Sequence, residues 1–352
     1  MKDITEQLQK FGLDAMLFSY MNNIFYLCGF KGTAGQLFVT RDDAFLITDF
    51  RYLSQAKEQT EDVTIIDIAN GEKAVFDKLI KEYNIKKTGF EQSYITYEKF
   101  LQLKKIFEGT KLFGVKGTVE EMRIVKTGDE LKLLSRACEI ADTAFETVFP
   151  RIKEGVTELE IAAMLEYEMK RQGASGASFE TIVASGKRSS MPHGTASTKP
   201  LKSGEFVVMD FGCVFGGYCS DITRTVAVGD ISDKMRDIYT KVQTVQEEML
   251  PLVKPGAACK AIDAESRKMF KTWGIDKYFG HSLGHGVGLD IHELPNLSPK
   301  SPYTLEENMI VTVEPGIYIE GEFGVRIEDT VKVGVKGAER LTKSDKNLRI
   351  CR

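Results

Sequence analysis

The first third of the chain alternates short apolar runs with stretches of helical spacing. The apolar runs are AMLFSY, QLFVT, AFLITD and VTIIDI, and the helical stretches cover residues 51–60 and 74–83. Apolar runs of this length are typical of buried strands, and amphipathic segments between them are typical of helices packed on a sheet. The pattern predicts an α/β domain over residues 1–124.

A helical pattern opens the second part of the chain. Thr127 stands three residues before Glu130, which is the spacing of a capping box at a helix N-terminus. Apolar residues follow at helical spacing, namely Leu134, Ala137, Ala141, Phe145 and Val148. We expect a second domain over residues 125–352. The length of 352 residues fits two domains at roughly 150 residues each.

The second domain contains a weak internal repeat. The segment PRIKEGVTELEIAA aligns with PLVKPGAACKAIDA, and LKSGEFVVMDFG aligns with LEENMIVTVEPG. Downstream, each half has an acid followed two positions later by threonine, Asp221 with Thr223 and Glu328 with Thr330. The repeat predicts two α+β units related by a pseudo-twofold axis around a shared centre.

Four carboxylates occupy equivalent strand ends in the two halves. Asp210 ends the apolar run FVVMD, and Glu314 ends MIVTVE. Asp221 opens DITRTVAV, and Glu328 lies in VRIEDTVKV. If the halves face each other these acids converge, and their repulsion and desolvation are costly without a cation. We favour a metal site over the alternative that each is a solvated acid at a strand end.

The chain has only four histidines, and three of them lie within GHSLGHGVGLDIHE. The glycines around His285 argue against a helix and predict an extended strand that lines a cleft. One imidazole with four carboxylates is a hard, oxygen-rich ligand set, which suits ions such as Mn²⁺ better than a structural zinc site. Two ions ~3.5–4 Å apart can share a hydroxide and stabilise the oxyanion of an amide, so metal-assisted hydrolysis is the expected reaction class.

These motifs resemble those of the pita-bread metallopeptidases, which comprise Xaa-Pro aminopeptidases, Xaa-Pro dipeptidases (prolidases) and methionine aminopeptidases. The resemblance covers essentially the whole chain. It implies an α+β pita-bread catalytic domain with a pseudo-twofold repeat over residues 125–352. A smaller α/β domain of the creatinase type, as in the proline-directed branch, then occupies residues 1–124.

The resemblance also implies a ligand set for two divalent metal ions, with Mn²⁺ expected and Co²⁺ or Zn²⁺ as alternatives. Asp221 and Glu328 would bridge the two ions, and Asp210 would bind one of them. His285 and Glu314 would complete the other, and Glu314 would also shuttle the proton.

The other histidines match the family's substrate-side positions. His193 in SMPHG, His281 in GHSLGH and His292 in DIHE would orient the scissile carbonyl and stabilise the tetrahedral intermediate. Arg326 matches an arginine that supports the ligands, and its alternative is a surface residue on a strand.

The implied activity is hydrolysis of the Xaa-Pro bond at the N-terminus of peptides by a metal-activated hydroxide, with Xaa-Pro dipeptidase as the alternative. The α/β domain and Arg326 disfavour methionine aminopeptidase. The complete ligand set disfavours metal-free creatinase and a non-catalytic binding module. Phe179 or Tyr218 is expected to accept the proline ring.

Charge and composition define the expected surroundings. Lysine and arginine number 47 against 51 acids, a net charge of −4, which gives no reason to expect nucleic acid or membrane as a partner. The N-terminus lacks the apolar core of a signal peptide, no run reaches the ~18 apolar residues of a membrane span, and the six cysteines are scattered. We expect a cytoplasmic protein, and the resemblance implies a homodimer.

Overall fold

The computed structural model describes residues 1–352, apart from the side chain of residue 70. The chain forms two compact units, Met1–Arg123 and Ile124–Arg352. Over the described part of the chain, no helix combines the length and the apolar character needed to cross a bilayer. The six cysteines are free and buried.

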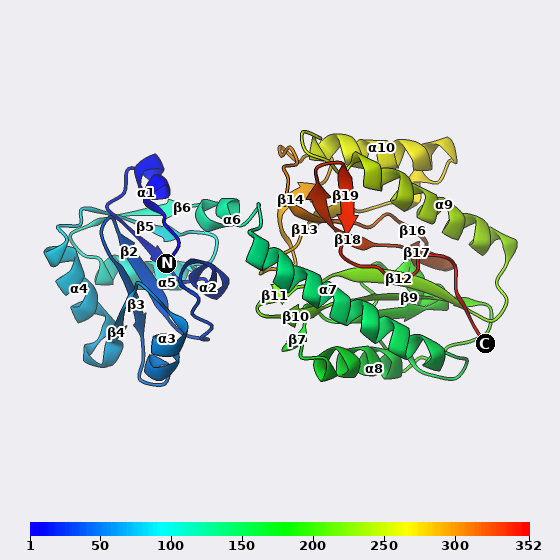
Figure 1. The fold of residues 1–352 in the computed structure, drawn as a ribbon, viewed down its shortest axis with the longest axis horizontal. Coiled ribbons are helices and arrows are strands. Elements are labelled where there is room, and N and C mark those ends of the chain that lie inside the picture. The colour runs from blue at the N-terminus through cyan, green and yellow to red at the C-terminus, as the bar shows by residue number, and fades with distance from the viewer. The chain divides into compact units, whose positions relative to one another are not determined.

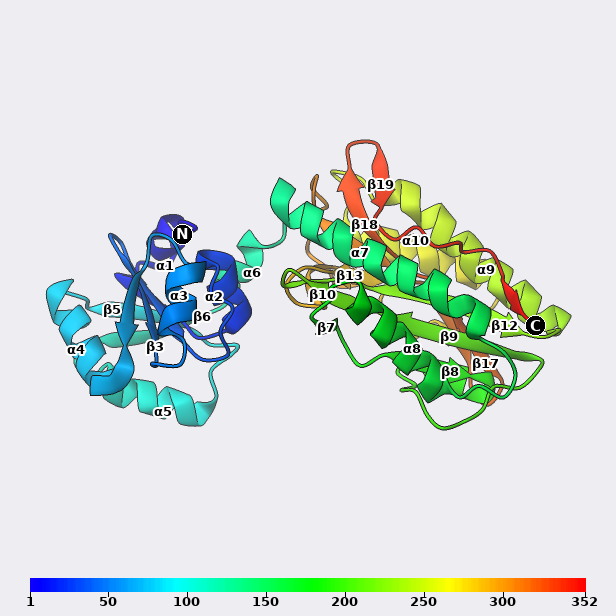
Figure 2. The ribbon, with the colours of Figure 1, turned by 60° about the horizontal axis from the view of Figure 1, so that its bottom comes forward.

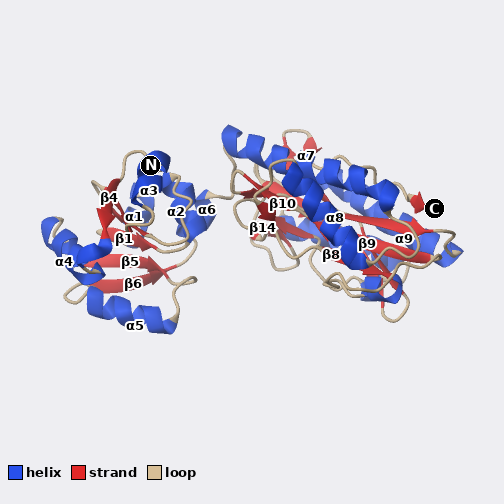
Figure 3. Cartoon of the chain, turned by 90° about the horizontal axis from the view of Figure 1, so that it is seen from below, coloured by secondary structure: helices blue, strands red, loops and turns tan.

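A mixed six-stranded sheet in the order β4-β3-β2-β1-β5-β6 forms the centre of the N-terminal unit, and helices cover both its faces (Figures 1 and 3). The pairs β3–β4, β1–β5 and β5–β6 are parallel, and the other two are antiparallel. Rings of Phe38, Phe76 and Phe107 pack together in its core. This architecture confirms the α/β prediction.

The elements of this unit alternate along the chain. The strands are β1 (Ala15–Phe18), β2 (Gln36–Thr40), β3 (Ala44–Thr48), β4 (Thr64–Asp67), β5 (Lys87–Glu91) and β6 (Lys111–Val115). The helices are α1 (Thr5–Phe11), α2 (Met21–Cys28), α3 (Leu53–Gln59), α4 (Glu72–Glu82), α5 (Tyr97–Ile106) and α6 (Thr118–Met122).

The C-terminal unit repeats one series of elements. Its first half has α7 and α8 followed by the antiparallel pair β9–β12, and its second half has α9 and α10 followed by the antiparallel pair β15–β18. In each half a 3₁₀ turn with proline, Phe149–Arg151 or Leu250–Leu252, follows the first helix. The repeat and the α+β fold expected from the sequence are confirmed.

The helices of the C-terminal unit are α7 (Gly128–Val148), α8 (Glu158–Arg171), α9 (Asp233–Met249) and α10 (Cys259–Thr272). The strands of the first half are β7 (Gly176–Ala177), β8 (Ile182–Ser185), β9 (Glu205–Phe211), β10 (Cys213–Phe215), β11 (Tyr218–Cys219) and β12 (Ile222–Val228). The strands that follow are β13 (Gly284–Gly286), β14 (Glu293–Leu297), β15 (Ile310–Val313), β16 (Gly316–Ile319), β17 (Phe323–Arg326), β18 (Asp329–Gly334), β19 (Gly337–Arg340) and β20 (Ile350–Cys351).

Two apolar cores hold helices against strands in the two halves. Phe145 of α7 and Phe211 of β9 lie in one core, and Tyr239 of α9 and Val331 of β18 lie in the other. Figures 1 and 2 show α7 and α8 along the green strands of the first half, and α9 and α10 in the second half. Because the helices occupy the outer faces, the ends of β9, β12, β15 and β18 are left to form a site.

Capping boxes fix where the helices of the first half begin. Thr127 accepts from the Glu130 amide while Glu130 accepts from the Thr127 amide, which confirms the predicted start of α7. Thr157 and Glu160 form the same box at α8. A capping box satisfies two backbone groups that would otherwise lack partners.

Candidate functional site

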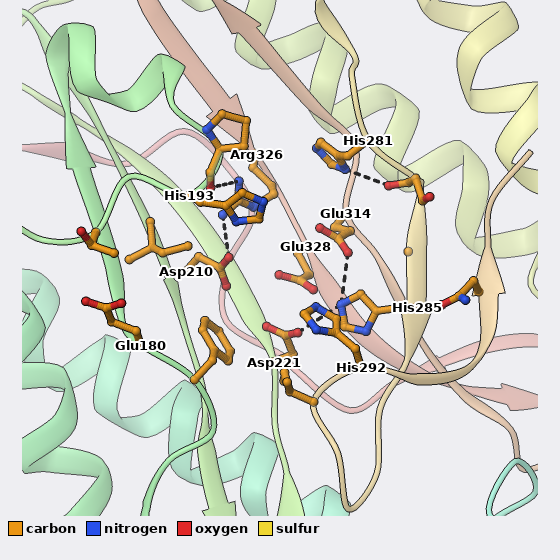
Figure 4. Close-up of a pocket in the computed structure, with 18 residues that line it drawn as sticks. Glu180, His193, Asp210, Asp221, His281, His285, His292, Glu314, Arg326 and Glu328 are labelled. Atoms are coloured by element: carbon orange, nitrogen blue, oxygen red, sulfur yellow. Dashed lines mark hydrogen bonds and ion pairs between the residues drawn. The ribbon is translucent and has the colours of Figure 1, made fainter. Parts of the chain in front are cut away.

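A cavity of about 470 Å³ in the C-terminal unit is lined by all the residues that the sequence predicted as metal ligands or catalytic residues (Figure 4). Carboxylates and imidazoles enter it from both halves of the repeat. These residues are His193, Asp210, Asp221, His281, His285, His292, Glu314, Arg326 and Glu328.

The strand ends bring the four acids together. Asp210 lies in β9 opposite Thr223 of β12, and Asp221 precedes β12. Glu314 follows β15, and Glu328 precedes β18. Asp221 is 4% exposed and Glu328 is 1% exposed, so these two are buried rather than solvated acids at strand ends.

His285 lies in the short strand β13, as the glycine pattern predicted. A Cβ atom on Gly284 would lie 2.0 Å from the Thr312 carbonyl oxygen, so a glycine is required where β13 passes β15. The backbone amide of His285 donates to Thr312 Oγ1 at 3.0 Å. That hydroxyl in turn donates to Glu314 Oε1 at 3.1 Å. Thr312 therefore sets His285 and Glu314 side by side.

The proton on His285 can be placed from its partners. Its Nδ1 lies 3.0 Å from the Gly286 carbonyl oxygen, which can only accept. Burial lowers the pKa of His285 to about 3, so the ring is neutral and Nε2 carries a lone pair. That lone pair lies 3.5 Å from Asp221 Oδ2 and 3.3 Å from Glu314 Oε1. Three electron-pair donors therefore face one another.

Burial makes ionisation of these acids costly. Burial first, and then the charge of Glu328, raises the pKa of Asp221 well above its usual value. Burial also raises the pKa of Glu328, with Glu314 as the next cause, and it raises the pKa of Glu314 to about 8. A cation among them would reverse this effect by favouring the charged carboxylates.

The donor set fits a metal ion. Side-chain ligand atoms of Asp221, His285 and Glu328 all lie within 4.8 Å of one another. Glu328 Oε1 and Asp210 Oδ1 are buried and have no hydrogen-bond partner in the described part of the chain. Figure 4 shows the carboxylates of Asp210, Asp221, Glu314 and Glu328 converging beside His285. An oxygen-rich set with one imidazole suits a hard or borderline divalent cation.

Arg326 is buried, with 3% of its surface exposed, so the alternative that it is a surface residue on a strand is wrong. Its Nη2 donates to Asp210 Oδ2 at 2.6 Å, and its Nε donates to Thr223 Oγ1 at 3.0 Å. Its Nη1 donates to Tyr318 Oη at 2.7 Å and to the Pro192 carbonyl at 3.2 Å. Arg326 therefore fixes a carboxylate of the site and the wall of the cavity together.

The remaining histidines line the cavity in different ways. His292 packs edge-on against His285, with ring centroids 4.3 Å apart, and His193 is exposed. His281 Nδ1 lies 2.8 Å from the Ser282 carbonyl, so Nε2 accepts from Tyr318 Oη at 3.0 Å. His281 is thus joined to Arg326 through Tyr318.

The two residues predicted to accept the proline ring have different positions. Phe179 lines the cavity. Tyr218 does not belong to the described lining, because its hydroxyl donates to Glu130 Oε1 at 2.9 Å, and that prediction is wrong.

Sequence reasoning gave no role to Tyr318 or to the threonine hydroxyls. Tyr318 follows Glu314 by four residues in EPGIYI, and an aromatic residue so close to a candidate ligand was an available signal. Thr223 and Thr330 stood out in the sequence only as members of the repeat. Thr223 donates a hydrogen bond to Glu328 and Thr330 donates one to Asp221, and these contacts join the two halves of the unit.

Comparisons with known proteins match both parts of the chain. Residues 132–334 match "Metallopeptidase family M24", and residues 1–125 match "Creatinase/Prolidase N-terminal domain". An Xaa-Pro dipeptidase from Pyrococcus horikoshii is 39% identical over 349 residues, covering 99% of this chain and 97% of the relative.

Two solved structures superpose over nearly the whole chain. An Xaa-Pro dipeptidase from Bacillus anthracis has a TM-score of 0.96 and 43% identity, covering 99% of this chain and 98% of its own. An X-Pro aminopeptidase from Thermotoga maritima MSB8 has a TM-score of 0.92 and 37% identity, covering 99% and 100%.

Proposed function

The chain belongs to metallopeptidase family M24 and carries a creatinase/prolidase N-terminal domain, and on this premise we propose that it hydrolyses the Xaa-Pro bond of short peptides. The observation that carries the proposal is the meeting of His285 Nε2 with buried carboxylates in one cavity. Asp210, Asp221, His285, Glu314 and Glu328 would hold two divalent ions, and the hard ligand set favours Mn²⁺.

The ions, when bound, supply Lewis acidity and lower the pKa of water so that it attacks an amide at neutral pH. Glu314 Oε1 accepts a hydrogen bond from Thr312 and faces His285 Nε2, which leaves Oε2 to take a proton from the attacking water. The same oxygen then passes that proton to the proline nitrogen, which leaves as a secondary amine. General acid–base transfer by a positioned carboxyl contributes typically 10²–10⁴-fold in rate.

The histidines act on the substrate carbonyl in this proposal. Desolvation lowers the pKa of His292, so the neutral ring offers an N–H to the developing oxyanion. Burial lowers the pKa of His281 to about 4, and its bond with Tyr318 holds the ring in place. His193 on the facing segment would close over the carbonyl. Phe179 supports the proline ring.

Dipeptides are one substrate candidate, because relatives named Xaa-Pro dipeptidase match the chain at 39% and 43% identity. Longer peptides are the second candidate, and the lining of the cavity supports them.

Arg326 is the one lysine or arginine among the described residues that line the cavity, and it is already bound to Asp210 and Tyr318. A dipeptide's carboxylate gains little from such an engaged cation, which favours a substrate that continues beyond proline.

Rates on Ala-Pro, Ala-Pro-Ala and Ala-Ala-Ala test both points. Preference for Ala-Pro-Ala over Ala-Ala-Ala supports proline-directed cleavage, and equal kcat/KM on these two removes it. The ratio of Ala-Pro to Ala-Pro-Ala then separates dipeptidase from aminopeptidase. A homodimer, carried over from the family resemblance, is tested by light scattering at micromolar protein, where a monomer mass refutes it.

A further inference from the structure

Glu158 is a fully buried carboxylate outside the ligand set. It is the first residue of α8 and has 0% exposure. Donors reach both of its oxygens, namely the Ser185 amide at 2.8 Å, Ser185 Oγ at 2.7 Å, Arg188 Nε at 3.0 Å, the Ser197 amide at 3.1 Å and Ser197 Oγ at 2.6 Å. A buried carboxylate is stable only with such a complete set of partners.

The donors lie at the two ends of one loop. The chain leaves β8 at Ser185 and returns at Ser197, so Glu158 joins the base of the segment 185–197 from both sides. Arg188 adds a second bond across the loop, from Nη2 to the Thr195 carbonyl at 2.6 Å. Two serine amides and one arginine would lose their partner together if this carboxylate were removed.

This loop forms a wall of the cavity. Pro192, His193 and Thr195 line it, and the Pro192 carbonyl accepts from Arg326. On its other side, Ser189 Oγ accepts from the Gly324 amide at 2.8 Å. Glu158 thus holds the base of a loop whose tip presents His193 and contacts the arginine beside Asp210.

Helix capping does not account for Glu158. The capping box of Thr157 and Glu160 already serves the start of α8, with the Glu160 amide bonded to Thr157 Oγ1 and the Thr157 amide bonded to Glu160 Oε2. The side-chain hydrogen bonds described for Glu158 all come from residues 185–197, and none comes from its own helix.

We propose that Glu158 is a positioning residue for the peptidase reaction, holding the loop 185–197 so that His193 meets the substrate carbonyl. The inference rests on the proposed function for the role of His193. It predicts that loss of the carboxylate loosens the loop and slows turnover while the metal ligands stay in place. Misplacing a catalytic group by about 1 Å can cost up to about 10²-fold in rate.

Glu158→Gln tests this, because it keeps the shape but replaces an accepting oxygen with an NH₂ that cannot accept. Glu160→Gln is the matched control, since it weakens the cap of the same helix and leaves the loop contacts intact. We expect Glu158→Gln to raise hydrogen exchange in residues 186–197 and to lower kcat/KM by roughly 10-fold to 100-fold. Bound metal should stay at the wild-type level. Glu160→Gln should change the melting temperature alone.

A double-mutant cycle tests whether Glu158 acts on turnover through His193. In a His193→Ala background, Glu158→Gln should cause little further loss of kcat/KM. An equal loss in both backgrounds, or unchanged exchange in the loop, overturns the proposal. If Glu158→Gln fails to fold, Ser197→Ala removes one donor from the loop side and must show the same changes at smaller size. Hydrogen exchange needs no substrate, so it decides the role of Glu158 even if Xaa-Pro peptides are not cleaved.

Discussion

Thr223 Oγ1 donates to Glu328 Oε2 at 2.7 Å, and the two residues come from opposite halves of the C-terminal unit. The reciprocal threonine, Thr330, donates to the Asp221 backbone carbonyl at 2.7 Å. Each half of the pseudo-twofold repeat therefore donates one threonine hydrogen bond to the other half. Only the first of these bonds reaches a carboxylate oxygen of the candidate ligand set.

Thr223→Val should weaken metal binding, since valine keeps the β-branched shape and removes the hydroxyl. Glu328 loses its donor and Arg326 Nε loses its acceptor. Loss of such an outer hydrogen bond typically lowers metal affinity 10–100-fold. Titration with Mn²⁺ followed by calorimetry measures the change.

Thr330→Val is the matched control, because its hydroxyl touches the backbone of Asp221 and no ligand oxygen. We expect it to lower stability by about 1 kcal/mol while metal affinity stays near wild type. Equal losses of affinity in the two variants would show that the side-chain bond to Glu328 has no special role.

Asp221→Asn and His292→Ala should separate metal binding from substrate handling. Asp221 is buried among the other acids, so its amide variant should lose metal and activity together. His292 is exposed and lines the cavity, and its loss should leave the metal bound. We expect His292→Ala to reduce kcat by roughly 10²-fold, the scale of one oxyanion donor.

The test measures the metal content and the kcat of the purified Asp221→Asn and His292→Ala variants. A His292→Ala protein without metal places that residue among the ligands. Normal turnover in it would instead remove His292 from the reaction.

Removing metal should abolish activity and lower the melting temperature. Any ligand that binds only the folded protein stabilises it, by about 2.7 kcal/mol when its free concentration is 100 times Kd. The chelated and dialysed protein should therefore melt lower and regain both properties with Mn²⁺ or Co²⁺. Full turnover in protein shown to be metal-free would falsify the metal mechanism.

The sequence predicts most of the fold because its signals are local. The capping box at Thr127 and Glu130 and the helical spacing after it depend on residues a few positions apart. The glycines around His285 likewise predicted a strand. The repeat extended this reasoning over a longer range, since it aligned Asp210 with Glu314 as equivalent positions and implied a shared centre. The roles of the individual site residues stay predictions.

Contacts made across the fold were not predictable in this way. Tyr318 reaches Arg326 and His281 only after β16 and β17 pair. Glu158 meets Ser185 and Ser197 over separations of 27 and 39 residues. In the sequence Glu158 reads as an ordinary acid in the first turn of a helix, and only its burial reveals another role. Tyr218 was misplaced for the same reason, since its partner Glu130 is 88 residues away.

A buried acid in the N-terminal unit gives a prediction on pH. Glu91 is 3% exposed and accepts from Asn23 Nδ2 at 2.6 Å and from the amides of Ser19 and Tyr20. Burial is the largest influence, and it raises the pKa of Glu91 from 4.5 to about 7 despite these hydrogen bonds.

Stability of this unit should therefore fall as the pH rises. In the unfolded chain Glu91 ionises near pH 4.5, so between pH 4.5 and 7 the folded protein holds a proton that the unfolded chain has lost. The contribution of Glu91 is fully present below pH 4.5 and is lost as the pH rises through 7. Relative to Glu91→Gln, the wild type should lose roughly 2 to 3 kcal/mol between pH 5 and 8. Urea unfolding at both pH values, followed by hydrogen exchange of the β1 and β5 amides, measures this loss of stability.

Glu121→Gln is the control, because it removes an exposed acid paired with Lys10 and should keep the wild-type pH dependence. A constant difference between wild type and Glu91→Gln at the two pH values would mean that Glu91 is already ionised in the folded protein at pH 5.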